Sequence, residues 1–331
     1  MADKKLTFLQ IGLGSMGKRR IRNLNANGEK NIIGFDVSPE RRREVEEKYG
    51  IKTIDDLKKL SDKDFDAVII STPPNAHGDY IRFALRNKKH FFAEVATSDD
   101  GYKDILENKN LNIVTAPSCT LRYFFPIRTI KKAVNEGKIG KILAYQYHVG
   151  QYLPDWHPWE DYRKVFFSKK ETGACRELFP FELCWINWLV GAEVADVSGV
   201  FGKVSDLDMD ADDVLFANLR HKNNVYGAIF IDAISRKPFR TLQLLGSDGA
   251  IEWEWQDWVI KIYDAKTKET EVIKAPKEDP TPGYTVQSEG MHQDELKAFL
   301  DAIYGLAPYP YTFEEDLQNL QTLYKLEKNE Q

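Results

Sequence analysis

In the first third of the chain, short apolar runs alternate with amphipathic stretches. The apolar runs are residues 6–11, 32–35, 67–70, 90–93 and 112–115. Several of them are followed by segments in which apolar positions recur at helical spacing, and glycine or proline separates one unit from the next. Strands that alternate with helices in this way are typical of a parallel sheet with right-handed crossovers and helices on both faces.

After about residue 120 the pattern changes to runs in which apolar and polar positions alternate. These runs are residues 142–149, 214–219, 226–231, 242–245, 251–255 and 259–263. Such alternation predicts strands with one buried and one wet face, and the turn signals between them indicate antiparallel pairing. Helices are expected over residues 127–135 and around residues 182–189. Two more helices are expected at the end of the chain, and the second begins at Thr312, where Glu315 completes a capping box.

Composition narrows the function classes. A chain of 331 residues fits two domains of ordinary size, and 42% hydrophobic with 29% charged residues is typical of a globular protein. Lys and Arg number 46 against 51 Asp and Glu, a net charge of −5, so we expect neither nucleic acid nor membrane as a partner. No apolar run is long enough to span a bilayer, and the N-terminus lacks the pattern of a secretory leader.

The three cysteines, Cys119, Cys175 and Cys184, contain no C-x-x-C pair. Their odd number and their spacing predict neither a disulfide framework nor a zinc site. We therefore expect no metal, a reducing compartment and a cytoplasmic location.

A glycine turn follows the first apolar run and leads into a helix-like stretch. Its sequence is Gly12-Leu13-Gly14-Ser15-Met16-Gly17, a G-x-G-x-x-G pattern. In this context Gly12 permits a tight turn, Gly14 lets the backbone approach a pyrophosphate, and Gly17 allows close packing of helix and strand. The helix N-terminus offers N–H groups to the phosphates. Asp36, at the end of the second run, would then accept the ribose hydroxyls; the alternative is a simple turn with a solvated Asp36.

Asp36 favours NAD, because its carboxylate would repel the 2′-phosphate of NADP. Ser38 and the arginine run 41–43 keep NADP open, although the same run also suits an exposed helix face. The sequence therefore predicts an α/β fold with two domains. Residues 1–119 form an N-terminal Rossmann dinucleotide-binding domain, and residues 120–331 form a C-terminal α/β domain with a large, mainly antiparallel open sheet.

Five motifs follow one another along the chain. They are residues 12–17 (GLGSMG), 71–77 (STPPNAH), 90–94 (HFFAE), 136–141 (EGKIGK) and 246–253 (GSDGAIEW). Together they resemble the Gfo/Idh/MocA family, the glucose–fructose oxidoreductase and inositol dehydrogenase relatives, over nearly the whole chain. Residues 150–163 (GQYLPDWHPWEDYR) resemble a subgroup found among surface-sugar biosynthesis oxidoreductases.

The resemblance implies NAD(P)-linked redox chemistry at a hydroxyl or carbonyl of a sugar, nucleotide sugar or cyclitol. It also implies that the open sheet of the C-terminal domain mediates oligomerisation, so that we expect a homodimer or homotetramer. The residues that it implies for cofactor binding are Gly12, Gly14, Ser15, Met16, Gly17, Asp36, Ser71, Thr72, Pro73, Asn75, His77 and Glu94.

The catalytic signature of the family does not carry over. Family members have Glu-Lys-Pro after the fifth strand, with the lysine close to the reacting hydroxyl, whereas this chain has Glu94-Val95-Ala96. When the chain is aligned on residues 188–191, the family's helix histidine becomes Phe181 and its aspartate becomes Cys184. General acid–base catalysis contributes roughly 10²–10⁴ in rate, so the proton relay is either non-standard or absent.

Three residues are candidates for the relay. Glu177 would act as a base, or it would brace the domain junction in an ion pair with Arg176. His157 would act as a base because histidine is the residue type suited to proton transfer near neutral pH, although a lone histidine is more often structural. Glu94 ends a strand at the edge where open α/β sheets bind ligands, or it makes a structural hydrogen bond to a neighbouring loop.

Aromatic and basic residues form the candidate substrate site. Aromatic faces with interleaved polar groups suit sugar rings, and arginine suits a carboxylate or phosphate. The alternative for the aromatic residues is a packed interdomain loop. The candidates are Arg122, Tyr123, Trp156, Tyr162, Arg163 and Arg176.

The predicted function is that of an NAD(P)-dependent oxidoreductase with a non-standard proton relay. Two alternatives stay open. One is a lyase- or hydrolase-type sugar enzyme that oxidises its substrate transiently with NAD, and the other is a non-catalytic protein that binds NAD or sugar.

Overall fold

The computed structural model describes residues 5–276 and 289–329. The chain folds as two compact units, and it returns to the first unit near its end. Met1–Thr120 and Glu289–Leu317 make up the first unit, and Leu121–Ser288 and Gln318–Gln331 make up the second. The sequence predicts an uninterrupted second domain instead. The difference arises because Leu296, Phe299 and Leu300 are buried in the core of the first unit.

The first unit is built on a six-stranded parallel sheet of order β3-β2-β1-β4-β5-β6. Its strands are β1 (Phe8–Ile11), β2 (Ile32–Phe35), β3 (Lys52–Ile54), β4 (Ala67–Ile70), β5 (His90–Ala93) and β6 (Thr115–Pro117). The first, second, fourth and fifth strands lie within the predicted apolar runs. The edge strand β3 is short and half polar, so its sequence carries no strand signal. The last strand begins at Thr115, where the predicted run ends.

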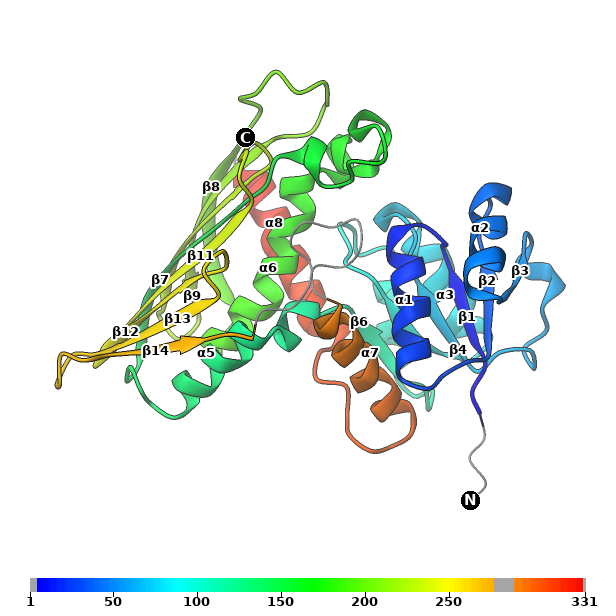
Figure 1. Ribbon diagram of the computed structural model, residues 1–331, viewed down its shortest axis with the longest axis horizontal. Helices are drawn as coiled ribbons and strands as arrows, with labels where there is room; N and C mark the ends of the chain where they lie inside the picture. Colours follow the sequence, from blue (N-terminus) through cyan, green and yellow to red (C-terminus); the bar gives the residue numbers. More distant parts are fainter. Residues whose placement is uncertain (1–4, 277–288, 330–331) are drawn as a thin grey trace. The chain divides into compact units, whose positions relative to one another are not determined.

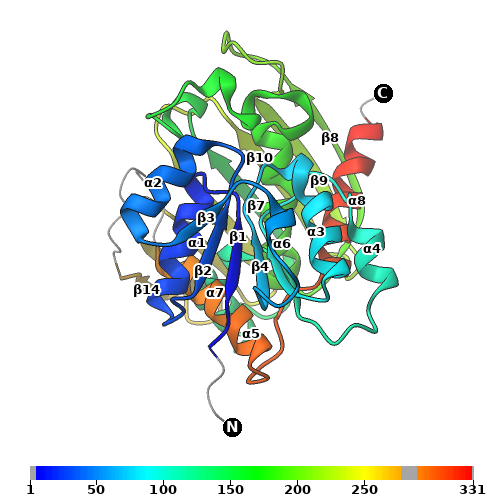
Figure 2. The ribbon, with the colours of Figure 1, turned by 90° about the vertical axis from the view of Figure 1, so that its right-hand side faces the viewer.

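Helices cover this sheet. All but the last of them follow one of its strands, as the alternating pattern predicts, and the last comes from the end of the chain. They are α1 (Ser15–Ala26), α2 (Pro39–Tyr49), α3 (His77–Arg86), α4 (Tyr102–Glu107) and α7 (Gly290–Ile303). Figures 1 and 2 show α1 and α7 side by side, in agreement with their contacts. Because α7 packs on α1, the adjacent residues Arg19 and Arg20 are both fully buried. A helix with an uncovered outer face would leave at least one of them in water.

The second unit contains an eight-stranded sheet of order β14-β13-β12-β11-β7-β10-β9-β8. All pairs are antiparallel except β7 with β10. The predicted mainly antiparallel sheet is therefore confirmed, with β8 and β14 added at its two edges. The strands are β7 (Ile142–Gly150), β8 (Val194–Gly202), β9 (Val214–His221), β10 (Tyr226–Asp232), β11 (Phe239–Gly246), β12 (Gly249–Glu254), β13 (Val259–Asp264) and β14 (Thr270–Lys274).

Helices α5 (Phe125–Asn135) and α6 (Ala174–Val190) lie on one face of this sheet (Figure 1). On that face Tyr147, Leu244 and Trp253 are buried, whereas Gln146 and Gln243 on the other face are exposed, as the alternation predicts. Helix α6 begins earlier than predicted. It contains Pro180, which lacks the N–H of an ordinary helix residue.

The last helix, α8 (Phe313–Asn329), crosses from the first unit into the second at residue 317. Its capping box is confirmed, because the N–H of Thr312 donates to Glu315 Oε2 at 2.9 Å and the N–H of Glu315 donates to Thr312 Oγ1 at 3.2 Å. Short 3-10 turns join β7 to α6. They are η4 (Leu153–Asp155), η5 (Tyr162–Lys164), η6 (Phe166–Ser168) and η7 (Lys170–Thr172). Among the helices described, none is long and apolar enough to cross a membrane.

Candidate functional site

The three glycines of the turn after β1 have different neighbours. Gly12 has φ +86°, and a side chain there would overlap the carbonyl oxygen of Ser71. A side chain at Gly17 would overlap the carbonyl oxygen of Gly12. At Gly14, by contrast, the nearest atom to an added Cβ is Arg41 Nη1 at 3.8 Å. The fold therefore requires Gly12 and Gly17, whereas the space beside Gly14 is open to a ligand.

The open space lies at the start of α1. Gly14 is the N-cap residue, and Ser15 and Met16 form the first turn. Since glycine has no side chain, no capping oxygen occupies the N-terminus of this helix. The first N–H groups and the positive end of the helix dipole are suited to an anion such as a pyrophosphate.

Asp36 lies directly after β2 and is 5% exposed. Its Oδ2 accepts the N–H of Leu13 at 2.8 Å, and its Oδ1 accepts the N–H of Ser38 at 2.9 Å. Arg41 Nη1 lies 3.7 Å from Oδ2. Asp36 thus ties the glycine turn to the end of β2, and a carboxylate keeps further lone pairs for ribose hydroxyls. Its role toward a ribose stays a prediction.

The loop after β4 contains two polar atoms that need a partner. His77 Nε2 donates to the carbonyl oxygen of Thr72 at 2.9 Å, and burial lowers the pKa of His77. The imidazole is therefore neutral, with its proton on Nε2. Its Nδ1 and Thr72 Oγ1 are buried and have no hydrogen-bond partner among the described residues. Buried polar atoms in this state are suited to a bound ligand, as are the exposed Pro73 and Asn75 of the same loop.

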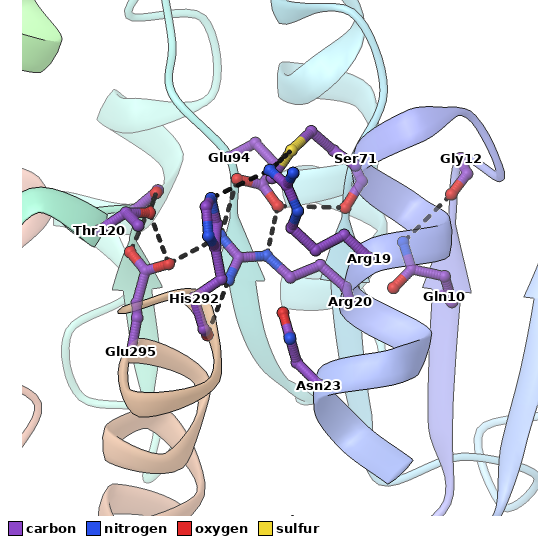
Figure 3. Close-up of polar contacts among 12 residues, drawn as sticks. Gln10, Gly12, Arg19, Arg20, Asn23, Ser71, Glu94, Thr120, His292 and Glu295 are labelled. Carbon is purple, nitrogen blue, oxygen red and sulfur yellow. Dashed lines mark hydrogen bonds and ion pairs between the residues drawn. The ribbon is translucent and has the colours of Figure 1, made fainter. Parts of the chain in front are cut away.

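Glu94, which follows β5, is held by a buried arginine (Figure 3). Arg20 Nε donates to Glu94 Oε1 at 2.6 Å, and Arg20 Nη2 donates to Oε2 at 2.9 Å. Ser71 Oγ lies 3.4 Å from Oε1. The structure thus pairs Glu94 with a helix residue rather than with a neighbouring loop alone. A carboxylate bound on both oxygens by a guanidinium is poorly suited to accept a proton.

A second carboxylate completes this cluster. Arg20 Nη2 also lies 2.7 Å from Glu295 Oε2, and Glu295 accepts hydrogen bonds from Ser118 Oγ at 3.0 Å and Thr120 Oγ1 at 2.8 Å. Burial raises the pKa of Glu295, and Arg20 opposes this effect. Burial alone would lower the pKa of Arg20, but Glu94 and Glu295 outweigh it and the pKa is raised. Arg20 therefore stays charged.

Sequence reasoning missed this cluster. Arg19, Arg20 and Glu295 look like ordinary surface charges on helices, and only the packing of α7 on α1 buries them. Gln10, a polar residue inside the first apolar run, is fully buried as well, and its Nε2 donates to the carbonyl oxygen of Gly12 at 3.1 Å.

In the second unit, the aromatic residues between β7 and α6 pack mainly on one another. Trp156 donates from Nε1 to the carbonyl oxygen of Gln151 at 3.1 Å and meets Phe167 edge-on at 4.9 Å. Tyr162 accepts the N–H of Asp208 at 3.0 Å on its hydroxyl. Both rings pack on a small core that includes Leu153. Trp156 and Tyr162 are thus packed within the loop, which is the alternative that the sequence left open. Their role in substrate binding stays a prediction.

His157 and Arg163 are the titratable candidates of this loop. His157 Nδ1 lies 2.6 Å from Glu160 Oε1, and the imidazole stacks on Trp159 at 5.0 Å. Arg163 binds both oxygens of Asp161 at 2.8 Å, and this hydrogen bonding lowers the pKa of Asp161 to about 2. A carboxylate that orients a histidine is the arrangement of a general base.

The remaining candidates lie on or beside α6. Glu177 is in its first turn and half-buried. Arg176 contacts Glu327 Oε1 at 2.6 Å and the carbonyl oxygen of Glu171 at 2.7 Å. Arg122 donates from Nε and Nη2 to the carbonyl oxygen of Cys184 at 3.0 and 2.8 Å. Both arginines therefore stabilise the second unit itself.

Tyr123 is half-buried, and so is Phe181, which stands where the family has histidine. A buried charge cluster lies one residue further on. Glu182 accepts hydrogen bonds from Tyr147 Oη at 2.8 Å and Trp185 Nε1 at 2.6 Å, and Arg240 Nη2 lies 3.0 Å from its Oε1. No group of three or more His, Cys, Asp or Glu side chains within the described ranges is arranged for a metal ion.

Comparison with known proteins places both halves of the chain in one family. The model described as "Oxidoreductase family, NAD-binding Rossmann fold" matches residues 6–107. The model described as "GFO/IDH/MocA C-terminal domain" matches residues 127–252.

Similar proteins with assigned activities include a 2,7-anhydro-N-acetylneuraminate hydratase of Mediterraneibacter gnavus, which is 23% identical over 261 residues, 77% of this chain and 68% of that protein. A myo-inositol 2-dehydrogenase of Thermotoga maritima is 25% identical over 258 residues, 73% of each chain. Among solved structures, a levoglucosan dehydrogenase in complex with NADH and levoglucosan superposes with a TM-score of 0.83 at 19% identity, and covers 98% of this chain and 97% of that one. At that identity the superposition establishes the shared fold.

The predicted resemblance and the α/β fold class are therefore confirmed, and so is the expectation of an NAD-binding Rossmann domain. The chain belongs to the Gfo/Idh/MocA family of oxidoreductases.

Proposed function

We propose that this protein is an NAD-linked oxidoreductase that acts on a hydroxyl or carbonyl of a sugar, nucleotide sugar or cyclitol. The observation that carries the proposal is the open approach to Gly14 at the N-terminus of α1, in a turn where Gly12 and Gly17 admit no side chain. The polyol class is supported by relatives named myo-inositol 2-dehydrogenase and scyllo-inositol 2-dehydrogenase.

In this proposal the cofactor is held by the glycine turn, Asp36 and the loop after β4. Bound NAD supplies the hydride acceptor. Asp36 favours NAD because a 2′-phosphate beside its buried carboxylate would be repelled. Arg41, 3.7 Å from that carboxylate, keeps NADP as the second cofactor to be tested.

The proton relay falls to Glu177, with His157 second. Val95 offers no titratable group, and Glu94 is bound on both oxygens by Arg20. Glu177 is a half-buried carboxylate in the first turn of α6, and the neighbouring Arg176 contacts Glu327 and a backbone carbonyl. In this role Glu177 would accept the hydroxyl proton during oxidation and return it during reduction.

The proposed substrate contacts are aromatic faces and arginines of the second unit. Trp156 and Tyr162 are half-buried and would offer ring faces, and Arg163 is 55% exposed and would meet a charged substituent. Tyr123 would contribute a phenol. Arg122 and Arg176 would act indirectly on the substrate site. Arg122 holds the backbone of α6 at Cys184, and Arg176 binds Glu327.

The experiment is a screen of polyols and sugars with NAD⁺, followed by absorbance of NADH. Glu177→Gln is expected to lower kcat by roughly 10²–10⁴ while the Kd of NAD stays unchanged. Glu171→Gln, an exposed carboxylate just before α6, is the matched control and should keep wild-type kcat. Full turnover by both Glu177→Gln and His157→Ala would show that the base lies elsewhere.

A second function is favoured by one relative, the hydratase of an anhydro sugar at 23% identity. In that case NAD would be used transiently, and elimination or addition of water would follow oxidation. The two functions differ in one readout. A dehydrogenase releases NADH in step with substrate consumption, whereas the transient scheme consumes substrate with no net NADH. Binding of NAD and sugars without any reaction would instead favour a non-catalytic protein.

We also propose that the chain forms a homodimer or homotetramer through the open face of the second-unit sheet. Helices α5 and α6 cover the opposite face. Phe216, Phe230 and His148 stack across three neighbouring strands on the open face, with ring centroids 4.0 Å apart. The exposed apolar residues in register on that face are Val200, Phe216, Tyr226, Leu245, Tyr263 and Val272. An apolar face of this extent is typical of a subunit interface.

The mass of the particle in solution tests this assembly. Phe216→Lys should shift the protein toward monomer in sedimentation or light scattering. Leu306→Lys, which changes an exposed apolar residue of the first unit, should not. A wild-type monomer at micromolar concentration would contradict the proposal.

We further propose a cytoplasmic location. It is supported by three free cysteines, all of them buried.

A further inference from the structure

The guanidinium of Arg20 is fully enclosed and engaged in the first unit. Its side chain is 0% exposed and lies 4.5 Å above the ring of Phe92. It bridges Glu94 and Glu295, and Nη1 donates to the carbonyl oxygen of His292 at 3.3 Å. Arg20 therefore does not reach a ligand, and its effect on one passes through Glu94.

Glu94 is the member of this cluster that faces outward. Its side chain is 11% exposed, against 0% for Arg20 and Glu295. Both of its oxygens are fixed by Arg20. A bidentate guanidinium–carboxylate pair sets the orientation of the carboxylate as well as its charge.

The order of the sheet places Glu94 relative to the cofactor site. Along the carboxyl edge, Asp36 follows β2, Gly12 follows β1, Ser71 follows β4 and Glu94 follows β5, and these strands are neighbours in that order. A dinucleotide whose adenosine ribose is at Asp36 and whose pyrophosphate is at the glycine turn extends along this edge toward β4 and β5. Glu94 thus belongs to the nicotinamide half.

The charge of Glu94 would affect the two redox forms of the cofactor differently. Glu94 is the outward-facing charge of the cluster, because its side chain is 11% exposed whereas the guanidinium of Arg20 is 0% exposed. The neighbouring Arg19 lies 3.5 Å from Glu289, and the nearby His77 is kept neutral by burial. The nicotinamide ring is positively charged in NAD⁺ and neutral in NADH, so a fixed negative charge beside it distinguishes the two forms.

We propose that Arg20 is a positioning residue that fixes Glu94 as a carboxylate beside the nicotinamide half of the site, and that this carboxylate favours NAD⁺ over NADH. The inference rests on the proposed function for the presence of the cofactor. It assigns Glu94 an electrostatic role in place of proton transfer. It also identifies a residue of α1 that the glycine pattern does not include.

The test is the ratio of the Kd of NADH to the Kd of NAD⁺, measured by calorimetry without substrate. A charge adjacent to a group that changes its own charge by one shifts such an equilibrium about tenfold or more, so Glu94→Gln should lower the ratio about tenfold. This variant should fold, because Arg20 keeps Glu295 as its partner. Arg20→Lys should shift the ratio in the same direction by less, since an ammonium retains the charge but not the two-point contact.

Arg22→Lys is the matched control. Arg22 lies on the same helix and pairs with Glu289 at 3.1 Å, but does not touch Glu94. It should leave the ratio unchanged. An unchanged ratio in a folded Glu94→Gln overturns the inference and leaves the proposed function intact. A shifted ratio in a protein that oxidises no polyol supports the inference and counts against the proposed function. Absence of binding of either cofactor form to the wild type overturns both.

Discussion

Replacement of Gly14 by alanine separates ligand binding from folding more sharply than the same change at Gly12 or Gly17. Gly14 has φ −70° and ψ −160°, which an alanine adopts without strain. Its new Cβ would find only Arg41 atoms, at 3.8 and 3.9 Å, which is ordinary van der Waals distance. At Gly17 the same methyl group would overlap the carbonyl oxygen of Gly12, so the turn itself would have to move.

The expected stability changes follow from these distances. Alanine is a poorer N-cap than glycine by about 1 kcal/mol. The reduced entropy of the unfolded chain offsets about 0.4–1 kcal/mol of this, so Gly14→Ala should leave the free energy of unfolding nearly unchanged. Gly17→Ala should lower it by about 3 kcal/mol or more, in the range of backbone strain combined with overpacking.

Replacement of Gly14 should leave the stability of the apo protein nearly unchanged but should weaken the binding of NAD. If the pyrophosphate approaches the turn at Gly14, a methyl group there should weaken NAD binding by at least about tenfold, or 1.4 kcal/mol. Gly14→Val, with two more carbon atoms, should weaken it further. Chemical unfolding of the apo proteins and calorimetric titration with NAD measure the two quantities separately. Wild-type NAD affinity in Gly14→Ala would refute the assignment of this turn to the pyrophosphate.

Three further outcomes are expected. Asp36→Ala should raise the affinity for NADP relative to NAD, and an unchanged ratio in paired titrations would remove Asp36 from the ribose site. His77 has its pKa lowered by burial, so its contribution to stability is present above its unfolded pKa of 6.5 and is lost as the pH falls toward the folded pKa. The melting temperature should therefore fall on acidification below about pH 6.5, and His77→Gln, whose amide can still donate to Thr72, should flatten that dependence. Arg240→Met should lower the free energy of unfolding by about 3–5 kcal/mol, because Glu182 is left charged in the core, and Glu182→Gln in the same protein should recover part of the loss.

Local patterns were sufficient for the architecture of both units. The apolar runs that alternate with helical segments predict β1, β2, β4 and β5. In the second sheet, apolar and polar residues alternate along each strand because one face is buried and the other is exposed, so this alternation predicts the strands. The strands that were missed lie at edges. The first-unit edge strand β3 and the second-unit edge strand β8 have little buried apolar surface, so their formation depends on a neighbour that the sequence does not display.

The sequence by itself determined the family, the glycine turn and the loss of the lysine, because each is a matter of residue type at a short, fixed spacing. Only the tertiary structure decided which charges are buried. Arg20 and Glu295 are distant in the chain and meet because α7 returns to pack on α1, and this contact turns Glu94 from a candidate base into a bound carboxylate. In the same way Arg122 and Arg176 look like substrate anchors in the sequence, whereas a backbone carbonyl and Glu327 engage them in the fold. The state of an ionisable side chain depends on its solvent and its partners, and distant segments supply both.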